Sequence, residues 1–322
     1  GHTALATLNA GADGFNTAVG FGAGAVMETG IYNTIVGGLA GDALTIGNQN
    51  TALGMLALSA SVDGDSNTAV GFSALRDYED GDGNGNNTAV GSNSQVAATT
   101  GEFNTSVGSL SQGVGVLTGD GNTSVGYQAG QAITSGSGNI AIGRGCGDAV
   151  TSGSDNISIG TSALGTEDEH GKNVAIGSSA LNALNAGADG YNVAVGYTAG
   201  AAMTTGVHNT VLGASAGLSI TDAIRNTLVG SVAGDALTTG NYNTALGWGA
   251  LTASVDGDKN TAIGYLTLAV YEDGSTNGYN TAVGSESQAA ASTGEFNTSL
   301  GGLSMGVGVT TGDYNVAVGY RA

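Results

Sequence analysis

The sequence predicts an all-β fold, a parallel β-solenoid of about 18 rungs of 17 residues. Three observations support this prediction. A five-residue motif, Asn-Thr-Ala-Val-Gly or a close variant, recurs 18 times along the 322 residues. Inside the motif, β-branched residues alternate with small ones, which is typical of a strand with a period of two. Glycine is abundant, with 60 residues, and proline is absent, so glycine turns can separate many short strands.

The regular spacing of the motif is the strongest signal. Most copies follow the previous one after 17 residues, and the longer intervals of 18 to 20 residues fall in polar turns, where insertions cost least. Such a repeat indicates structurally equivalent rungs that stack on one another. The motif asparagines are Asn16, Asn33, Asn50, Asn67, Asn87, Asn104, Asn122, Asn139, Asn156, Asn173, Asn192, Asn209, Asn226, Asn243, Asn260, Asn280, Asn297 and Asn315.

Each unit is predicted to begin with a strand. The second motif position is always β-branched, the fourth is always Val, Ile or Leu, and the third is Ala or Ser in 15 of 18 copies. The second and fourth positions should therefore share one face and the third position the other. We expect the Val/Ile/Leu column to be buried, at about 1.5–3 kcal/mol per side chain, and the Ala/Ser face to be left exposed.

A glycine bend, a second short strand and a polar turn should complete the unit. The bend is the motif glycine, which every copy keeps. The segment Phe72–Leu75 is an example of the second strand, and Thr100–Phe103 is an example of the turn. Glycine at these places indicates a positive φ or a close approach of two backbones.

Stacked rungs would also align identical side chains along the axis. The motif asparagines are expected to form a ladder and to pair amide to amide between rungs about 4.8 Å apart. The ladder positions that we single out are Asn16, Asn33, Asn50, Asn67, Asn139 and Asn156, followed by Gly20, Gly37, Gly54, Gly71, Gly143 and Gly160.

A longer repeat of about 176–193 residues is superimposed on the short one. Residues 1–37 match 177–213, and residues 38–126 match 231–319. The second copy contains one additional unit, residues 214–230. A stack of equivalent rungs tolerates the insertion of a whole unit.

The two ends of the chain are cut in phase with the repeat. We therefore expect residues 1–322 to form a single continuous array that is an internal fragment of a longer fibre.

Composition excludes several classes of protein. The chain has 26 acidic and 6 basic residues and a formal net charge of −20. Nucleic acid and anionic membrane surfaces need clustered Lys and Arg, so we expect neither as a partner. No apolar run is long enough to insert into a bilayer. A hydrophobic content of 40% argues against disorder.

The sequence does not predict an enzyme. His2, His170 and His208 lie in turns or at variable positions, and no second ligand or base recurs near them. Cys146 occupies a column that holds Ala or Ser in other units, which favours a structural thiol, and Arg144 is weak support for a reactive one. We therefore predict no catalytic residue and no cofactor.

The repeat resembles a known family. The unit Asn-Thr-Ala-Val-Gly-x-x-Ala-Leu, followed by a Thr-Gly turn, is similar to the head repeats of YadA-type trimeric autotransporter adhesins, and still more to the repeats of phage tail fibres with a C-terminal intramolecular chaperone. The resemblance covers the whole chain. It implies a trimeric, left-handed parallel β-roll with Val and Ile columns packed inside. The YadA-type unit is shorter and usually reads Ser-Val-Ala-Ile-Gly.

The functional hypothesis is a structural and adhesive segment of a trimeric extracellular fibre, either a bacterial surface adhesin or appendage or a phage tail fibre. A narrow rung leaves one face uncovered, and association of three chains around an axis would cover it. The expected partners are two further copies of the chain and a cell-surface or glycan receptor. The alternative is an ice-binding β-solenoid, because a column of threonines could order water.

One candidate metal site stands in an acidic insertion. Asp77, Glu79, Asp80 and Asp82 provide oxygen ligands in a glycine-containing loop, as Ca²⁺ prefers. The matching insertion in the second copy keeps only two of the acids, so a solvated acidic loop is the competing interpretation.

Two further patterns have plain alternatives. Asn104, Asn122 and Asn297 each begin an Asn-Thr-Ser glycosylation sequence, which the repeat also produces by itself. Aromatic residues that follow the motif glycine could form a lateral contact stripe or simply decorate the surface; they are Phe21, Phe72, Tyr127, Tyr197, Trp248 and Tyr265.

Overall fold

The computed structural model describes residues 1–9, 14–79, 85–113, 115–167, 169–271, 278–306 and 311–322. In these residues the fold is a parallel β-solenoid, as predicted, with no helix, so none of them forms a helix that could cross a membrane. Each motif forms one three-residue strand. The strands are β1 (Thr17–Val19), β2 (Thr34–Val36), β3 (Thr51–Leu53), β4 (Thr68–Val70), β5 (Thr88–Val90), β6 (Thr105–Val107), β7 (Thr123–Val125), β8 (Ile140–Ile142), β9 (Ile157–Ile159), β10 (Val174–Ile176), β11 (Val193–Val195), β12 (Thr210–Leu212), β13 (Thr227–Val229), β14 (Thr244–Leu246), β15 (Thr261–Ile263), β16 (Thr281–Val283), β17 (Thr298–Leu300) and β18 (Val316–Val318).

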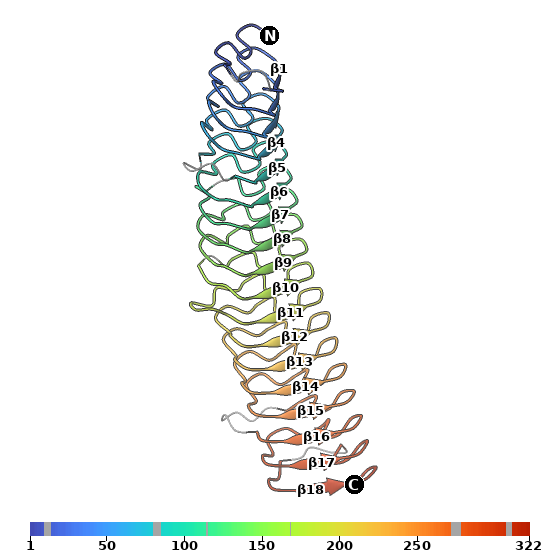
Figure 1. Cartoon of the computed structure of the whole chain (residues 1–322). Coiled ribbons are helices and arrows are strands. Elements are labelled where there is room, and N and C mark those ends of the chain that lie inside the picture. Colours follow the sequence, from blue (N-terminus) through green and yellow to red (C-terminus); the bar gives the residue numbers. More distant parts are fainter. Residues whose placement is uncertain (10–13, 80–84, 114, 168, 272–277, 307–310) are drawn as a thin grey trace. The chain divides into compact units, whose positions relative to one another are not determined.

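The chain divides into two compact units, Gly1–Ser158 and Ile159–Ala322, which we call unit 1 and unit 2. Unit 1 contains β1 to β8, unit 2 contains β10 to β18, and β9 holds the boundary. Within each unit consecutive strands are parallel neighbours that pair motif position to motif position, as Thr17 does with Thr34 and Thr244 with Thr261 (Figure 1). The left-handed coil and the single continuous array stay predictions.

The strands turn the opposite face inward from the one that we expected. The third motif position is buried in β2 to β17, whereas the second and fourth positions are exposed or half-buried. Ala52 and Ala245, for example, are fully buried, while Leu246 is 47% exposed. The interior is narrow, because a second small column, represented by Ala57 and Ala250, is buried there too. The third position stays buried even where it is large, at Ile35, Val211 and Leu228, so the strand position and not side-chain size sets which face turns inward.

The predicted second strand is also wrong. After the motif glycine the chain folds into turns, and the only bridge outside the named strands in the described residues joins Ala98 to Leu117. Alternate residues of this segment adopt a left-handed backbone, such as Leu56 (φ 60°) and Leu58 (φ 53°). An extended strand cannot contain such residues. The pattern of residue types in this short segment led to the wrong prediction, because it does not reveal whether φ is positive or negative.

The motif glycine itself is explained by close backbone packing. At Gly37, φ is 145°, and a Cβ atom would lie 2.3 Å from the carbonyl oxygen of Gly54 in the next rung. The same collision would occur at Gly213, 2.5 Å from the carbonyl group of Gly230. No other residue fits this column without moving the backbone, as the sequence predicted.

Large side chains are buried in more than one interior column: Leu58 and Leu75 lie in one, and a second changes its side chains from rung to rung. The second column holds Met27 and Leu44 in successive rungs, both fully buried, and then changes to Ser61 and Tyr78. The Tyr78 ring reaches toward the rung of Ser61, because its Cε1 atom would lie 3.1 Å from a Cβ placed on Gly64. A small side chain thus makes room for a large one in the neighbouring rung. Unit 2 repeats the arrangement with Ser254 and Tyr271.

Candidate binding surfaces

The outer face of the sheet is the first surface that could bind a partner. The second motif position contributes a column of Thr, interrupted by Ile or Val, and the fourth contributes a column of Val, Ile and Leu. Its apolar members are substantially exposed: Leu212 is 44%, Leu246 is 47% and Leu300 is 50% accessible. A continuous apolar stripe of this kind on a monomer marks an interaction site. We call these two columns the outer sheet face.

The asparagine ladder lies on the inner side of the coil. Asn139 accepts the backbone N–H of Asn156 at its Oδ1 atom (3.0 Å) and donates from Nδ2 to the carbonyl of Gly153 (2.8 Å). Asn50 makes the same two bonds, to Asn67 N–H and to the carbonyl of Gly64. The predicted stacking is therefore confirmed within each unit, but its main bonds run from side chain to backbone.

Direct amide-to-amide bonds are the minor component of the ladder. Asn139 Nδ2 also lies 3.1 Å from Asn122 Oδ1, and Asn226 Nδ2 lies 3.2 Å from Asn209 Oδ1. Each such side chain forms hydrogen bonds with a buried backbone N–H and a buried carbonyl. Without it, two polar groups per rung would be buried without a partner, at a cost in stability.

The ladder also explains the glycosylation sequences. Asn104, Asn122 and Asn297 are fully buried, and each donates from Nδ2 to a backbone carbonyl. The amide nitrogen that a glycan would modify is thus inside the fold. In the folded chain these sequences are a consequence of the repeat.

Two asparagines depart from the pattern. Asn67 and Asn260 each begin a 20-residue repeat. Each still accepts the backbone N–H of the next ladder asparagine, Asn87 or Asn280. Their Nδ2 atoms, however, are buried without a hydrogen-bond partner. The longer repeat therefore lacks one of the two ladder bonds, at the matching position in unit 1 and in unit 2.

Acidic turn residues form a second set of rung-to-rung bonds. Asp120 accepts the backbone N–H of Glu102 at 2.9 Å, and Asp313 accepts that of Glu295 at 2.9 Å. In other rungs a serine hydroxyl accepts the equivalent bond: Ser137 Oγ accepts the backbone N–H of Asp120. Part of the acidic composition thus has a structural role, because carboxylates are strong acceptors for exposed backbone donors.

The calcium candidates lie partly outside the described residues. Asp80 and Asp82 are not described. Asp77 forms an ion pair with Arg76 at 2.6 Å, and Glu79 accepts the backbone N–H of Val62 at 3.1 Å. In the described part of the chain, no three His, Cys, Asp or Glu residues lie together as a metal site would require. Calcium binding stays a prediction.

The histidines and the cysteine have structural contacts. His2 stacks on Phe21, and His208 stacks on Tyr191 with ring centroids 5.2 Å apart. Cys146 is buried in the small interior column, and burial raises the pKa of its thiol to about 11. A thiol with so high a pKa is almost wholly protonated at neutral pH and is a poor nucleophile.

A buried carboxyl lies beside a histidine in the first rung of unit 2. Glu167 is fully buried, 3.4 Å from the Nδ1 atom of His170, and accepts the backbone N–H groups of His170 and Ala186. Burial raises the pKa of the Glu167 carboxyl in spite of these bonds. The repeat does not predict this buried acid, because the same position holds uncharged residues in other rungs, such as Leu44 and Ser61.

Aromatic side chains occupy two exposed columns. The six residues predicted to form a lateral stripe after the motif glycine are 48–64% exposed, and Trp248 stacks on Tyr265 at 5.3 Å. The second column, directly before the motif asparagine, was missed. Sequence comparison of that position across rungs would have found it, since unit 2 places an aromatic or basic residue there in every rung.

The comparisons with known proteins do not identify a relative. The sequence matches no protein-family model and no curated protein. The repeat and the exposed surfaces are therefore the features that bear on function.

Proposed function

We propose that the chain is a structural and adhesive segment of a trimeric extracellular fibre on a cell surface or a virion. The motif and its period resemble the repeats of YadA-type adhesins and phage tail fibres. In such a fibre the solenoid is a stiff support, and three copies multiply weak contacts with a receptor through their effective concentration.

The exposed outer sheet face is the observation that supports trimer formation best. Three-residue strands leave the Thr and Val/Ile/Leu columns on the outside, where the apolar members are exposed, as Leu246 is, or only half-buried, as Val70 is. Packing this face against its counterparts around a threefold axis would bury a column from every rung. The proposal differs from the sequence-based one in its interface, because the Ala/Ser face is already buried.

A charge placed on this face tests the proposal. Leu246→Lys inserts an ammonium group into the proposed interface, and desolvation of that charge should dissociate the trimer. Thr239→Lys is the matched control, because Thr239 is exposed in the turn that precedes the same strand. Sedimentation velocity should show a trimer for the wild type and the control and a smaller species for Leu246→Lys. Equal sedimentation of all three would contradict the proposed interface.

Ice binding is the second candidate, because the outward orientation of the threonine column favours it. Thr210, Thr227 and Thr244 are exposed on neighbouring strands, and such a regular face could order water. In other rungs the column holds Ile or Val, as at Ile140. A trimer would cover the face, so the two functions are separable: thermal hysteresis from a monomeric chain supports ice binding, and its absence removes this candidate.

A further inference from the structure

One exposed column of unit 2 is almost entirely aromatic or cationic. It consists of the residue that directly precedes the motif asparagine in nine successive rungs, and we call it the aromatic–cationic ribbon. Its members are Lys172, Tyr191, His208, Arg225, Tyr242, Lys259, Tyr279, Phe296 and Tyr314.

Neighbouring members of the ribbon are in contact. Lys172 donates to the Tyr191 hydroxyl at 3.2 Å, and Tyr191 stacks on His208 at 5.2 Å. Farther along, Arg225 donates to the Tyr242 hydroxyl at 2.6 Å, and its guanidinium lies 5.5 Å from that ring.

The last four members continue the series. Lys259 lies 4.8 Å from the centre of the Tyr279 ring, and Phe296 stacks on Tyr279 at 5.1 Å and on Tyr314 at 4.9 Å. These spacings follow the strand spacing of about 4.8 Å, so nine rungs extend the ribbon over about 38 Å.

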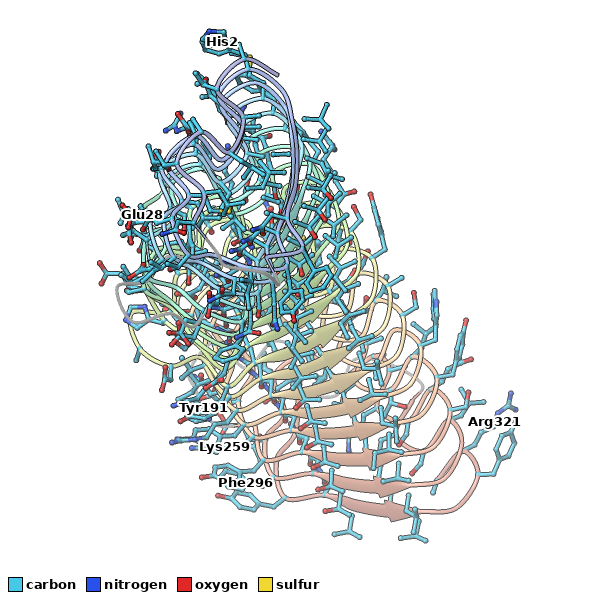
Figure 2. The ribbon with its side chains drawn as sticks, turned by 45° about the horizontal axis from the view of Figure 1, so that its top comes forward. His2, Glu28, Tyr191, Lys259, Phe296 and Arg321 are labelled. Atoms are coloured by element: carbon cyan, nitrogen blue, oxygen red, sulfur yellow. The ribbon has the colours of Figure 1, made fainter. Side chains whose placement is uncertain are left out.

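The ribbon side chains point outward. Tyr242, Lys259 and Tyr279 adopt a left-handed backbone, with φ values of 59°, 57° and 47°. Tyr191, Lys259 and Phe296 project from one edge of unit 2 (Figure 2). The rings are 38–75% exposed. Stacking covers their faces, so a partner meets a row of ring edges, tyrosine hydroxyls and basic groups.

Unit 1 shows that the fold does not require this ribbon. At the positions that match Tyr242, Lys259, Tyr279 and Tyr314, unit 1 has Gln49, Ser66, Asn86 and Gly121. The backbone is the same, with φ values of 59°, 58°, 51° and 65° in unit 1. The aromatic and basic residues therefore meet a need other than folding, and a column with four Tyr, one Phe and one Arg among nine residues has the composition of a binding surface.

The charge around the ribbon limits the kind of ligand. Lys172, Arg225 and Lys259 supply three positive charges. Carboxylates lie beside them: Asp189 forms an ion pair with Lys172, and Asp258, Glu295 and Asp313 come directly before ribbon residues in the sequence. A nearly balanced strip favours neither a polyanion nor a polycation, and the net charge of −20 further repels polyanions. An uncharged ligand with many hydroxyl groups would find donors and acceptors of both kinds.

The regular pitch indicates a linear polymer. A pyranose unit in an extended chain advances by about one strand spacing, so successive sugars can meet equivalent ring edges in successive rungs. The hydroxyl groups of each sugar would meet tyrosine hydroxyl, lysine and carboxylate groups, which donate and accept hydrogen bonds. We propose that the aromatic–cationic ribbon of unit 2 binds an uncharged, extended polysaccharide that lies parallel to the stack. This inference rests on the proposed adhesive function and names its receptor class.

Calorimetric titration of the whole chain with cellohexaose, xylohexaose and β-1,4-mannohexaose tests the proposal, with polygalacturonate as the polyanion. At least one hexasaccharide should bind, and the corresponding disaccharide should bind much more weakly because it contacts fewer rungs. The fourfold variant Tyr242→Gln, Lys259→Ser, Tyr279→Asn and Tyr314→Gly transfers the unit 1 residues and should weaken binding roughly tenfold or more. Phe103→Ser, an isolated aromatic residue in the same column of unit 1, is the control and should leave binding unchanged.

Four results would overturn the proposal: no binding of any hexasaccharide, tighter binding of polygalacturonate, unchanged binding by the fourfold variant, or a changed oligomeric mass of that variant. The last result would make the ribbon a contact between copies of the chain. The mass of the wild type in the same samples reports on the fibre separately. If the chain is a trimer but binds no glycan, glycan binding is contradicted and the fibre proposal is not. If the chain is a monomer but binds a glycan, only the proposed trimer is contradicted.

Discussion

Units 1 and 2 share their interior and differ on their surface. Both have the small buried column and the asparagine ladder. In both, a serine in one rung makes room for the tyrosine of the next rung, Ser61 for Tyr78 and Ser254 for Tyr271. We call this arrangement the Ser–Tyr exchange. Both even leave the same ladder amide without a partner. The column before the motif asparagine, by contrast, is mixed in unit 1 and aromatic or basic throughout unit 2. Packing inside a narrow rung leaves few choices, whereas an outward residue is free to serve a partner.

The largest expected effect concerns the glycine bend, where the two units should behave alike. Gly37→Ala and Gly213→Ala place a Cβ within 2.3–2.5 Å of the next rung and should each cost about 4 kcal/mol or more. Gly38→Ala is the control, because nothing lies within 4 Å of its Cβ position. Urea unfolding followed by circular dichroism measures the difference, and a mild effect at Gly37 would refute the close backbone packing.

The Ser–Tyr exchange predicts the next largest effect. Tyr78→Ala and Tyr271→Ala should each cost about 3–5 kcal/mol, because they empty a space that no neighbouring side chain fills. Adding Ser61→Leu to Tyr78→Ala should recover part of the loss, since Leu44 occupies that column one rung earlier. A double variant that is no more stable than Tyr78→Ala would show that the two residues do not share a space.

The ladder permits a comparison between rungs of one unit. Asn50→Ala leaves an N–H and a carbonyl without partners and should cost about 2–4 kcal/mol, whereas Asn67→Ala removes only one such bond and should cost about half as much. The same ranking is expected for Asn243→Ala and Asn260→Ala in unit 2. Equal losses at Asn50 and Asn67, measured by urea unfolding, would contradict the ladder geometry.

The smallest expected effect is a pH dependence of stability that comes from the buried acid of unit 2, Glu167. Because burial raises the folded-state pKa of Glu167, the folded chain holds a proton there more tightly than the unfolded chain does. That contribution to stability is complete below the unfolded pKa, about 4.3, and is lost as pH rises through the folded pKa. Glu167→Gln should therefore gain stability relative to the wild type between pH 4 and pH 7. The exposed neighbour Glu169→Gln should not, and parallel pH profiles for Glu167→Gln and the wild type would refute the assignment.

The sequence predicted the repeating features well and the orientation of side chains poorly. The strands, the glycine bend and the aligned asparagines follow from strict columns, which one chain displays 18 times. Hydrophobicity suggested that Val and Leu face inward, as they do in wider folds. Leu246 is outside because the third motif position turns inward, where Ala245 and, one rung earlier, Leu228 are both buried. Residue type alone does not reveal this orientation.

The candidate surfaces were predictable only in part. The exposed aromatic residues after the motif glycine, such as Phe72, follow from their position beside a bend. The ribbon before the asparagine was hidden because Gln49 and Ser66 occupy the same column in unit 1, and only the structure shows that this column is exposed. Glu167 could not be predicted, since its buried environment comes from neighbouring rungs.

The mass of the folded chain in solution tests the central claim, that the outer sheet face joins three copies, most directly. Sedimentation equilibrium should give 93.0 kDa, three times the chain mass of 31.0 kDa, over a wide range of concentration. A well-folded species of 31.0 kDa that persists at high concentration would contradict it.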